Sequence, residues 1–114
     1  LFVEHFNKYD VLWNGERGRT IFFQNEKAYD APNQAAVQDG TTKGFAAYKV
    51  ADSVQTHEGW GLGSYCNFTA DSSIQQDNGF QAPSHPGVKF HDLLVVSLGG
   101  MGQYNHVIND VGGA

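Results

Sequence analysis

Two glutamates in the first quarter of the sequence have the spacing of a catalytic carboxyl pair. Glu4 lies in "VEHF", and Glu26 lies 22 residues later in "TIFFQNEKAYD". One circuit of a parallel β-helix uses roughly 20 to 30 residues, so in such a fold the two side chains would stack on adjacent strands about 4.8 Å apart. Two carboxyl groups that close do not both ionise readily, and one is expected to keep its proton. Glycoside hydrolysis uses such a proton donor, together with a second carboxyl that assists water or stabilises positive charge.

Polar and aromatic residues elsewhere in the chain are candidate sugar contacts. The predicted substrate-binding residues are Gln24, Tyr29, Trp13, Trp60 and His57. An aromatic ring stacks on the apolar face of a sugar, although Trp and Tyr are equally at home in a core. His57 and Glu58 are adjacent, so in a strand one of them would line the cleft and the other would be buried or on the back.

Five histidines, at positions 5, 57, 85, 91 and 106, raise the question of a metal site. They lack the H-x-H and H-E-x-x-H spacings of known metal sites, although three could still converge in space as a copper site requires. We expect no metal ligands and no other cofactor. Cys66 is the single cysteine, which excludes an internal disulfide.

Composition narrows the range of partners. Twelve acidic and seven basic residues give a net charge of −5, which argues against nucleic acid as a partner. No apolar run approaches the ~20 residues of a membrane span, so no membrane partner is expected. Eight Phe, five Tyr, two Trp and fourteen Gly suit a protein that handles neutral polysaccharide, or any secreted β-protein. We expect an extracellular protein.

Short strands separated by Gly, Asp and Asn turns account for most of the sequence. The predicted strands are 2–6, Val11–Trp13, 20–24, 45–50, 63–68, 88–90, 93–98 and Gln103–Ile108, with one short helix at 33–38. Two all-β architectures compete: a right-handed parallel β-helix segment, and a small β-sandwich or jelly roll. The close succession of "VKF", "LLVVSL" and "HVI" favours the β-helix, in a single domain over residues 1–114.

Two stretches carry a resemblance to a known family. "EHFNKYDVLWNG…TIFFQNEKAYDAPNQ" and "HEGWGLGSYCNF" resemble the C-terminal coils of family-55 glycoside hydrolases in the pectate-lyase-like superfamily. The resemblance implies a right-handed parallel β-helix and exo-acting, inverting cleavage of β-1,3-glucan. It also implies that Glu26 is the general acid and that Glu4 is a second acidic group in the cleft. Family members are several times longer, so we expect this chain to be the C-terminal portion of a longer protein.

Two other functions remain open at this stage. One is a non-catalytic module that binds polysaccharide through Trp13, Trp60 and Tyr29. The other is a small copper-dependent enzyme that acts oxidatively on polysaccharide. A β-helix segment would expose unpaired strand edges at its ends, so we expect either a further portion of the protein or a homo-oligomer to cover them.

Overall fold

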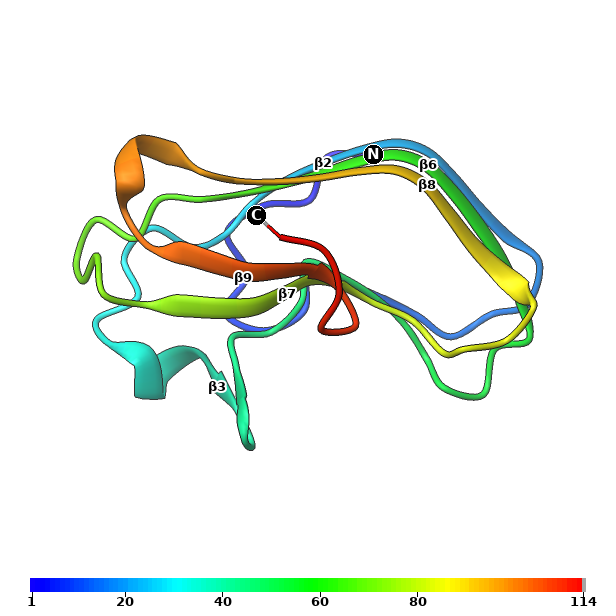
Figure 1. Cartoon of the computed structure of the whole chain (residues 1–114), viewed down its shortest axis with the longest axis horizontal. Helices are drawn as coiled ribbons and strands as arrows, with labels where there is room; N and C mark the ends of the chain where they lie inside the picture. The colour runs from blue at the N-terminus through cyan, green and yellow to red at the C-terminus, as the bar shows by residue number, and fades with distance from the viewer. Residues whose placement is uncertain (114) are drawn as a thin grey trace.

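The computed structural model describes residues 1–113, which form strands and turns with two short 3₁₀-helices (Figure 1). The elements in chain order are β1 (Val11–Trp13), β2 (Gly18–Glu26), η1 (Gln34–Val37), β3 (Gln38–Asp39), β4 (Thr42–Lys43), β5 (Tyr48–Val50), β6 (Thr56–Cys66), β7 (Gln75–Gln81), β8 (Gly87–Ser97), η2 (Leu98–Gly100) and β9 (Gln103–Ile108). The all-β prediction is therefore confirmed. Within the described residues, neither helix has the length and apolar character that crossing a bilayer requires.

Successive strands alternate between two parallel sheets. One sheet has the order β1-β5-β7-β9 and the other β2-β6-β8, while β3 and β4 form a small antiparallel hairpin. Each circuit returns the chain beside itself, since Gly18 pairs with His57 and His57 pairs with Val88. The first of these circuits is the longer because it includes η1 and the β3–β4 hairpin, which project at the lower left of Figure 1. Jelly rolls are built from antiparallel strands, so the observed pairing does not fit that alternative.

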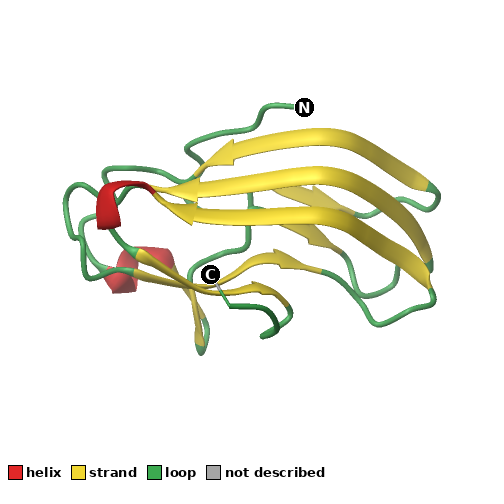
Figure 2. Ribbon diagram, turned by 45° about the horizontal axis from the view of Figure 1, so that its top comes forward, coloured by secondary structure: helices red, strands yellow, loops and turns green. Residues whose placement is uncertain are grey.

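The three long strands of the second sheet bend together at one position (Figure 2). Phe22, Gly61 and Asp92 have φ angles of 61°, 65° and 58° and fall between consecutive register pairs of their strands. This left-handed conformation suits glycine, is tolerated by aspartate and is strained for phenylalanine. We call the part of the sheet before the bend the proximal arm (residues 18–21, 56–60 and 87–91) and the part after it the distal arm (residues 23–26, 62–66 and 93–97).

Apolar side chains from both sheets form one core. Phe23, Leu62 and Val95 contribute from the distal arm, and Tyr48 and Phe80 from the facing sheet. The rings of Phe23 and Tyr48 meet edge-on with their centroids 5.3 Å apart. Because strand side chains alternate between faces, this core fixes which residues of the distal arm point outward.

The sequence prediction missed β7 and assigned residues 75–79 to a turn. The segment is mostly polar, but parallel pairing with β5 and β9 satisfies its backbone on both edges. Its buried side chains are hydrogen-bonded: Gln76 Nε2 donates to the carbonyl of Phe45 at 2.8 Å, and Asn78 Nδ2 donates to Asp110 Oδ1 at 2.9 Å. Polar residues can occupy an inner strand when their hydrogen bonds are satisfied internally.

The bounds of β6 and β8 differ most from the prediction. β6 begins at Thr56 rather than at residue 63, and β8 joins the two strands predicted at 88–90 and 93–98. In both cases a residue that suggested a turn, Gly61 or Asp92, bends the strand without ending it, because one left-handed residue interrupts the ladder only locally.

Candidate active site

The first residues of the chain run alongside β2 and thereby position Glu4. The predicted N-terminal strand is reduced to a single parallel bridge between Phe2 and Gln24. The parallel path nevertheless continues, because the N–H of His5 donates to the carbonyl of Glu26 at 2.8 Å. Two residues after the bridge on each segment, Glu4 lies beside Glu26.

The carboxyl groups of Glu4 and Glu26 form a cluster with the imidazole of His5. One oxygen of each glutamate and one nitrogen of the histidine all lie within 4.8 Å of one another. His5 Nε2 is 3.3 Å from Glu26 Oε2. The side chains of His5 and Glu26 are 47% and 27% exposed, so the cluster opens to solvent. The structure thus shows the close approach of the two carboxyl groups on which the sequence interpretation depended.

Tyr29 completes this cluster. Its hydroxyl donates a hydrogen bond to Glu26 Oε2, and its ring lies 4.7 Å from the His5 ring. The hydrogen bond to Glu26, more than burial, raises the pKa of Tyr29 to about 12. The phenol therefore keeps its proton and acts as a donor to Glu26 at neutral pH. The sequence predicted Tyr29 as a substrate contact, but it considered His5 only as one of five histidines.

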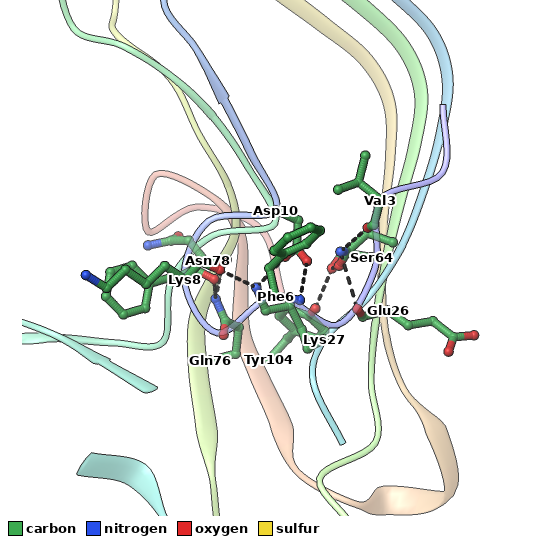
Figure 3. A network of polar contacts seen from close by, with 12 residues as sticks. Val3, Phe6, Lys8, Asp10, Glu26, Lys27, Ser64, Gln76, Asn78 and Tyr104 are labelled. Atoms are coloured by element: carbon green, nitrogen blue, oxygen red, sulfur yellow. Dashed lines mark hydrogen bonds and ion pairs between the residues drawn. The ribbon is translucent and has the colours of Figure 1, made fainter. Parts of the chain in front are cut away.

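A buried ion pair lies beneath the cluster and ties the loop after Glu4 to β2 (Figure 3). Lys27 Nζ donates to Asp10 Oδ2 at 2.6 Å, and the two side chains are 6% and 0% exposed. Lys27 also donates to the carbonyl of Lys8 at 3.3 Å, and Asp10 Oδ1 accepts from the N–H of Phe6 at 3.2 Å. Burial lowers the pKa of Lys27 and raises that of Asp10, and their attraction opposes both shifts. Sequence reasoning missed this pair because its members are 17 residues apart with no motif in common.

A second set of buried hydrogen bonds holds the N-terminal segment against the distal arm. Asn25 Nδ2 donates to the carbonyl of Val3 at 2.7 Å, and Asn25 Oδ1 accepts from Ser64 Oγ at 2.7 Å. Ser64 Oγ in turn lies 2.6 Å from the hydroxyl of Tyr104. In Figure 3 the side chain of Glu26 points away from this interior network. The backbone of Glu26 is therefore fixed from within, while its carboxyl remains on the outer face.

Comparison with known proteins bears on this same stretch of chain. A model of the LAM55 pectate lyase-like domain matches residues 1–26, which include both glutamates. An exo-beta-1,3-glucanase of Streptomyces sp. (strain SirexAA-E / ActE) is 75% identical over 112 residues, which make up 98% of this chain. The chain thus resembles the family-55 glycoside hydrolases of the pectate-lyase-like type.

Solved structures agree with the family-55-like assignment. The structure of sacteLam55A from Streptomyces sp. SirexAA-E matches with a TM-score of 0.96 at 75% identity, over 97% of this chain and 20% of that chain. A variant of sacteLam55A in complex with glucose matches with a TM-score of 0.96 at 74% identity and the same coverage. The family-55-like chain thus spans 18% of the glucanase and 20% of each solved chain.

Two predicted substrate contacts, Trp13 and His57, lie at the opposite end of the fold from the carboxyl pair. Their rings are 5.0 Å apart, and His57 is 2% exposed with its Nε2 2.9 Å from the hydroxyl of Tyr48. A Cβ at Gly18 would come within 2.4 Å of both rings, and Gly18 precedes Glu26 by eight residues, about 26 Å along β2. His57 points into the core, where burial lowers its pKa, and its contact with substrate stays a prediction. Trp13 packs on the same interior group rather than beside the carboxyl pair.

Trp60 lies on the outer face of the proximal arm with both faces of its indole covered. The Arg19 guanidinium carbon is 5.3 Å from the ring centroid, and the His91 ring stacks at 5.4 Å with an interplanar angle of 15°. Arg19 comes from β2 and His91 from β8, on opposite sides of β6. His91 Nε2 is also 2.9 Å from Glu58 Oε2. Contact between Trp60 and a sugar stays a prediction, and it requires one of these neighbours to move.

The histidines do not gather into a site of the copper type. His91 and His106 belong to strands of different sheets, and His85 Nδ1 lies 2.8 Å from the carbonyl of Val54. In the described part of the chain, the potential metal ligands that converge are Glu4, His5 and Glu26, with a single imidazole. The copper chemistry considered above needs three converging histidines, so this donor set does not fit it.

A larger hollow than the one beside Phe22 lies away from the carboxyl pair, on the sheet that contains β5, β7 and β9. It has a volume of about 460 Å³ and polar walls that include Lys49, Asp77 and Gln81. Asp77 already accepts hydrogen bonds from the β3–β4 hairpin and from Asn105. None of the predicted site residues lines this hollow, so we do not assign the active site to it despite its volume.

Proposed function

We propose that this chain forms coils of a right-handed parallel β-helix in a secreted, exo-acting β-1,3-glucan hydrolase. The observation that carries the proposal is the Glu4–Glu26 pair, whose oxygens lie within 4.8 Å on a chain 75% identical to an exo-beta-1,3-glucanase. The alternation of strands between two parallel sheets, one of them bent, supports the β-helix.

Glu26 acts as the general acid in this proposal and protonates the glycosidic oxygen as the C–O bond breaks. His5 and Tyr29 both contact Oε2 of Glu26. Because Oε2 accepts the hydrogen bond from the Tyr29 hydroxyl, the transferable proton belongs on Oε1, for which the described residues supply no hydrogen bond. Tyr29 and His5 thus orient the carboxyl and leave one oxygen for substrate.

The short distance between the two carboxyl groups restricts the role of Glu4. Inverting glycosidases separate their acid and base by about 6.5–9.5 Å to admit a water molecule. One oxygen of Glu4 lies within 4.8 Å of one oxygen of Glu26, which is shorter than that separation. Of the two roles considered for Glu4, this spacing favours stabilisation of positive charge on the sugar over activation of water. The inverting reaction implied by the resemblance then needs its base from another part of the protein.

We place that other part outside this sequence. The chain spans 18% of the glucanase it matches, and we propose that it is the C-terminal portion of a longer extracellular protein. The remaining portion would supply the opposite wall of the cleft and the group that activates water. A second copy covering the open sheet edges is the competing arrangement, which the mass measured by size-exclusion chromatography with light scattering distinguishes.

Replacement of Glu26 by glutamine tests the proposed acid. In the full-length polypeptide that carries this sequence, Glu26→Gln should lower the rate of glucose release from laminarin by at least about 100-fold. Glu58→Gln is the matched control, because Glu58 is a partly exposed carboxylate paired with a histidine on the proximal arm. Unchanged hydrolysis by a folded Glu26→Gln protein excludes Glu26 as the acid.

A polysaccharide-binding module without chemistry is the second candidate. The observation that favours it is the small share of the relatives that this chain covers, since one wall of a cleft can bind without cleaving. In that case the chain would be retained on insoluble β-1,3-glucan without releasing glucose. The Glu26→Gln and Glu58→Gln variants would be retained equally well.

A further inference from the structure

A groove floored by two glycines runs along the outer face of the distal arm. It has a volume of about 210 Å³. Gly61 and Gly63 of β6 supply the floor, since they have no side chains to fill the space between β2 and β8. Phe22 stands on the β2 side and Leu94 on the β8 side, and these side chains are 57% and 50% exposed. The walls are therefore mostly apolar.

Two of the residues that line the groove, Gln24 and Tyr65, are neighbours of Glu26. Gln24 lines it and shares the outer face of β2 with Glu26, because the intervening Asn25 is buried. Two residues along a strand correspond to about 7 Å. Tyr65 also lines the groove and is the register partner of Glu26 on β6. A molecule held in the groove would thus have one end at Glu26.

Phe22 occupies its place in the groove against its backbone preference. Its φ of 61° is rare for a bulky residue, and the neighbouring strand has glycine at the equivalent position. Strained residues of this kind cluster at ligand sites. The left-handed conformation keeps the Phe22 ring on the outer surface, where it meets Phe2 edge-on at 5.8 Å. A core role does not account for a side chain that is more than half exposed.

The lining has the chemistry of a sugar site. The Phe22 and Tyr65 rings offer surfaces on which the CH face of a pyranose packs. Gln24 and Asp92 add an amide and a carboxylate, and no hydrogen bond engages either side chain within residues 1–113. We propose that this groove binds the glucose unit next to the bond that Glu26 cleaves, with Phe22 as its stacking platform. The proposal rests on the proposed glucan hydrolase.

Binding of laminaritriose measured by isothermal titration calorimetry tests the groove. The measurement uses the full-length polypeptide in the Glu26→Gln background, so that the ligand is not hydrolysed. Gly63→Ala adds one methyl group to the floor, and its Cβ would lie 3.4 Å from the Tyr65 ring, an ordinary contact. Phe22→Asn removes the platform but keeps a residue that tolerates left-handed backbone. Both changes should weaken binding at least tenfold without lowering the melting temperature.

Gly15→Ala is the matched control for the added methyl group. Gly15 lies in the turn after β1, and its Cβ would be 3.8 Å from Trp13 Nε1, so this variant should bind like the parent. The proposal that the groove binds sugar is overturned if the parent does not bind laminaritriose. It is also overturned if the parent and the Phe22→Asn protein bind it with equal affinity. Either result leaves the assignment of Glu26 intact if Glu26→Gln still abolishes hydrolysis, so the two proposals fail separately.

Discussion

The proximal and distal arms belong to the same three strands, yet the side chains on their outer faces differ in how they are paired. On the proximal arm, Arg19, Trp60 and His91 stack in a row, and His91 also pairs with Glu58. On the distal arm, the outer face carries the glycine-floored groove and the glutamate pair, both open to solvent. Side chains that satisfy one another stabilise a surface, whereas the Gln24 and Asp92 side chains beside the groove, which make no hydrogen bond within residues 1–113, are available to a ligand. Function is therefore expected at the distal arm.

The inner faces of the two arms also differ. Beneath the proximal arm, Trp13, Tyr48 and His57 pack as a group of rings. Beneath the distal arm, the apolar core is joined by a polar interior network, the Lys27–Asp10 ion pair beside the Asn25 hydrogen bonds. Aromatic packing tolerates small shifts, while hydrogen bonds and a close ion pair fix atoms in direction and distance. The polar interior lies under the residues whose positions matter most for catalysis.

The largest effect is expected from breaking the ion pair under the distal arm. Lys27→Met leaves the Asp10 carboxylate, which is 0% exposed, without its partner. An uncompensated buried charge of this kind destabilises a protein by about 3–5 kcal/mol. Urea unfolding should show this loss, and hydrolysis should fall as well, because Asp10 holds the loop that follows Glu4.

The double variant Lys27→Met/Asp10→Leu separates charge from position. Replacing both partners by apolar residues removes the unpaired charge, and such replacements are often neutral for stability. We expect stability to recover while hydrolysis recovers less, since the bonds from Lys27 to Lys8 and from Phe6 to Asp10 are gone. Full recovery of both would show that the pair does not position the active site.

A smaller effect is expected when the donor to Glu26 is removed. Tyr29→Phe deletes the hydroxyl that bonds to Glu26 Oε2 but keeps the ring beside His5. A hydrogen bond to an ionisable group contributes about 1.5–3 kcal/mol, so laminarin hydrolysis should slow by about tenfold or more. Tyr9→Phe is the control, because the Tyr9 hydroxyl bonds to Asp39 near the β3–β4 hairpin. Equal rates for the two variants would remove Tyr29 from the mechanism.

The proximity of Glu4 and Glu26 followed from the sequence because the circuit between them contains no insertion. A spacing of 22 residues matches one turn of a parallel coil, and the N-terminal segment does return beside β2. The next circuit, from Gly18 to His57, is longer because it includes η1 and the β3–β4 hairpin. Spacing along the sequence therefore predicts which residues are neighbours in space only where the number of residues in the circuit is already known.

The direction of side chains was harder to predict because the bend changes which positions point inward. On β6, His57 is buried and Trp60 points outward, but after the left-handed Gly61 the pattern restarts with Leu62 in the core. One such residue reverses the alternation for the rest of a strand, in the same way as a slip of register. The sequence shows Gly61 as one glycine among several, so the outward groove could not be derived from it.

The proximal arm should make stability depend on pH. His57 is buried, and burial lowers its pKa below the ordinary value of 6.5, so the folded protein binds its proton less readily than the unfolded chain. Stability from this residue is complete above pH ~6.5 and is lost as the pH falls through the folded pKa, by up to about 1.4 kcal/mol per pH unit. The His57→Gln protein should lose less stability between pH 7.5 and pH 5.0 in urea unfolding. A steeper loss in the variant would contradict the neutral, buried histidine.

The smallest effect on substrate binding is expected at Trp60. A structural role and a substrate-binding role for this residue predict different affinities for laminaritriose. If the covered face of the proximal arm is purely structural, Trp60→Ala loses the Arg19 and His91 contacts and about 1–2 kcal/mol of stability. Laminaritriose affinity should then stay within about twofold of the parent, since a difference of 0.4 kcal/mol is the most that remote repacking should transmit. A tenfold weaker affinity would instead mean that substrate displaces Arg19 or His91 and extends over the proximal arm. The outer faces of the two arms would then form one continuous binding surface, and their separation at the bend would have no functional meaning.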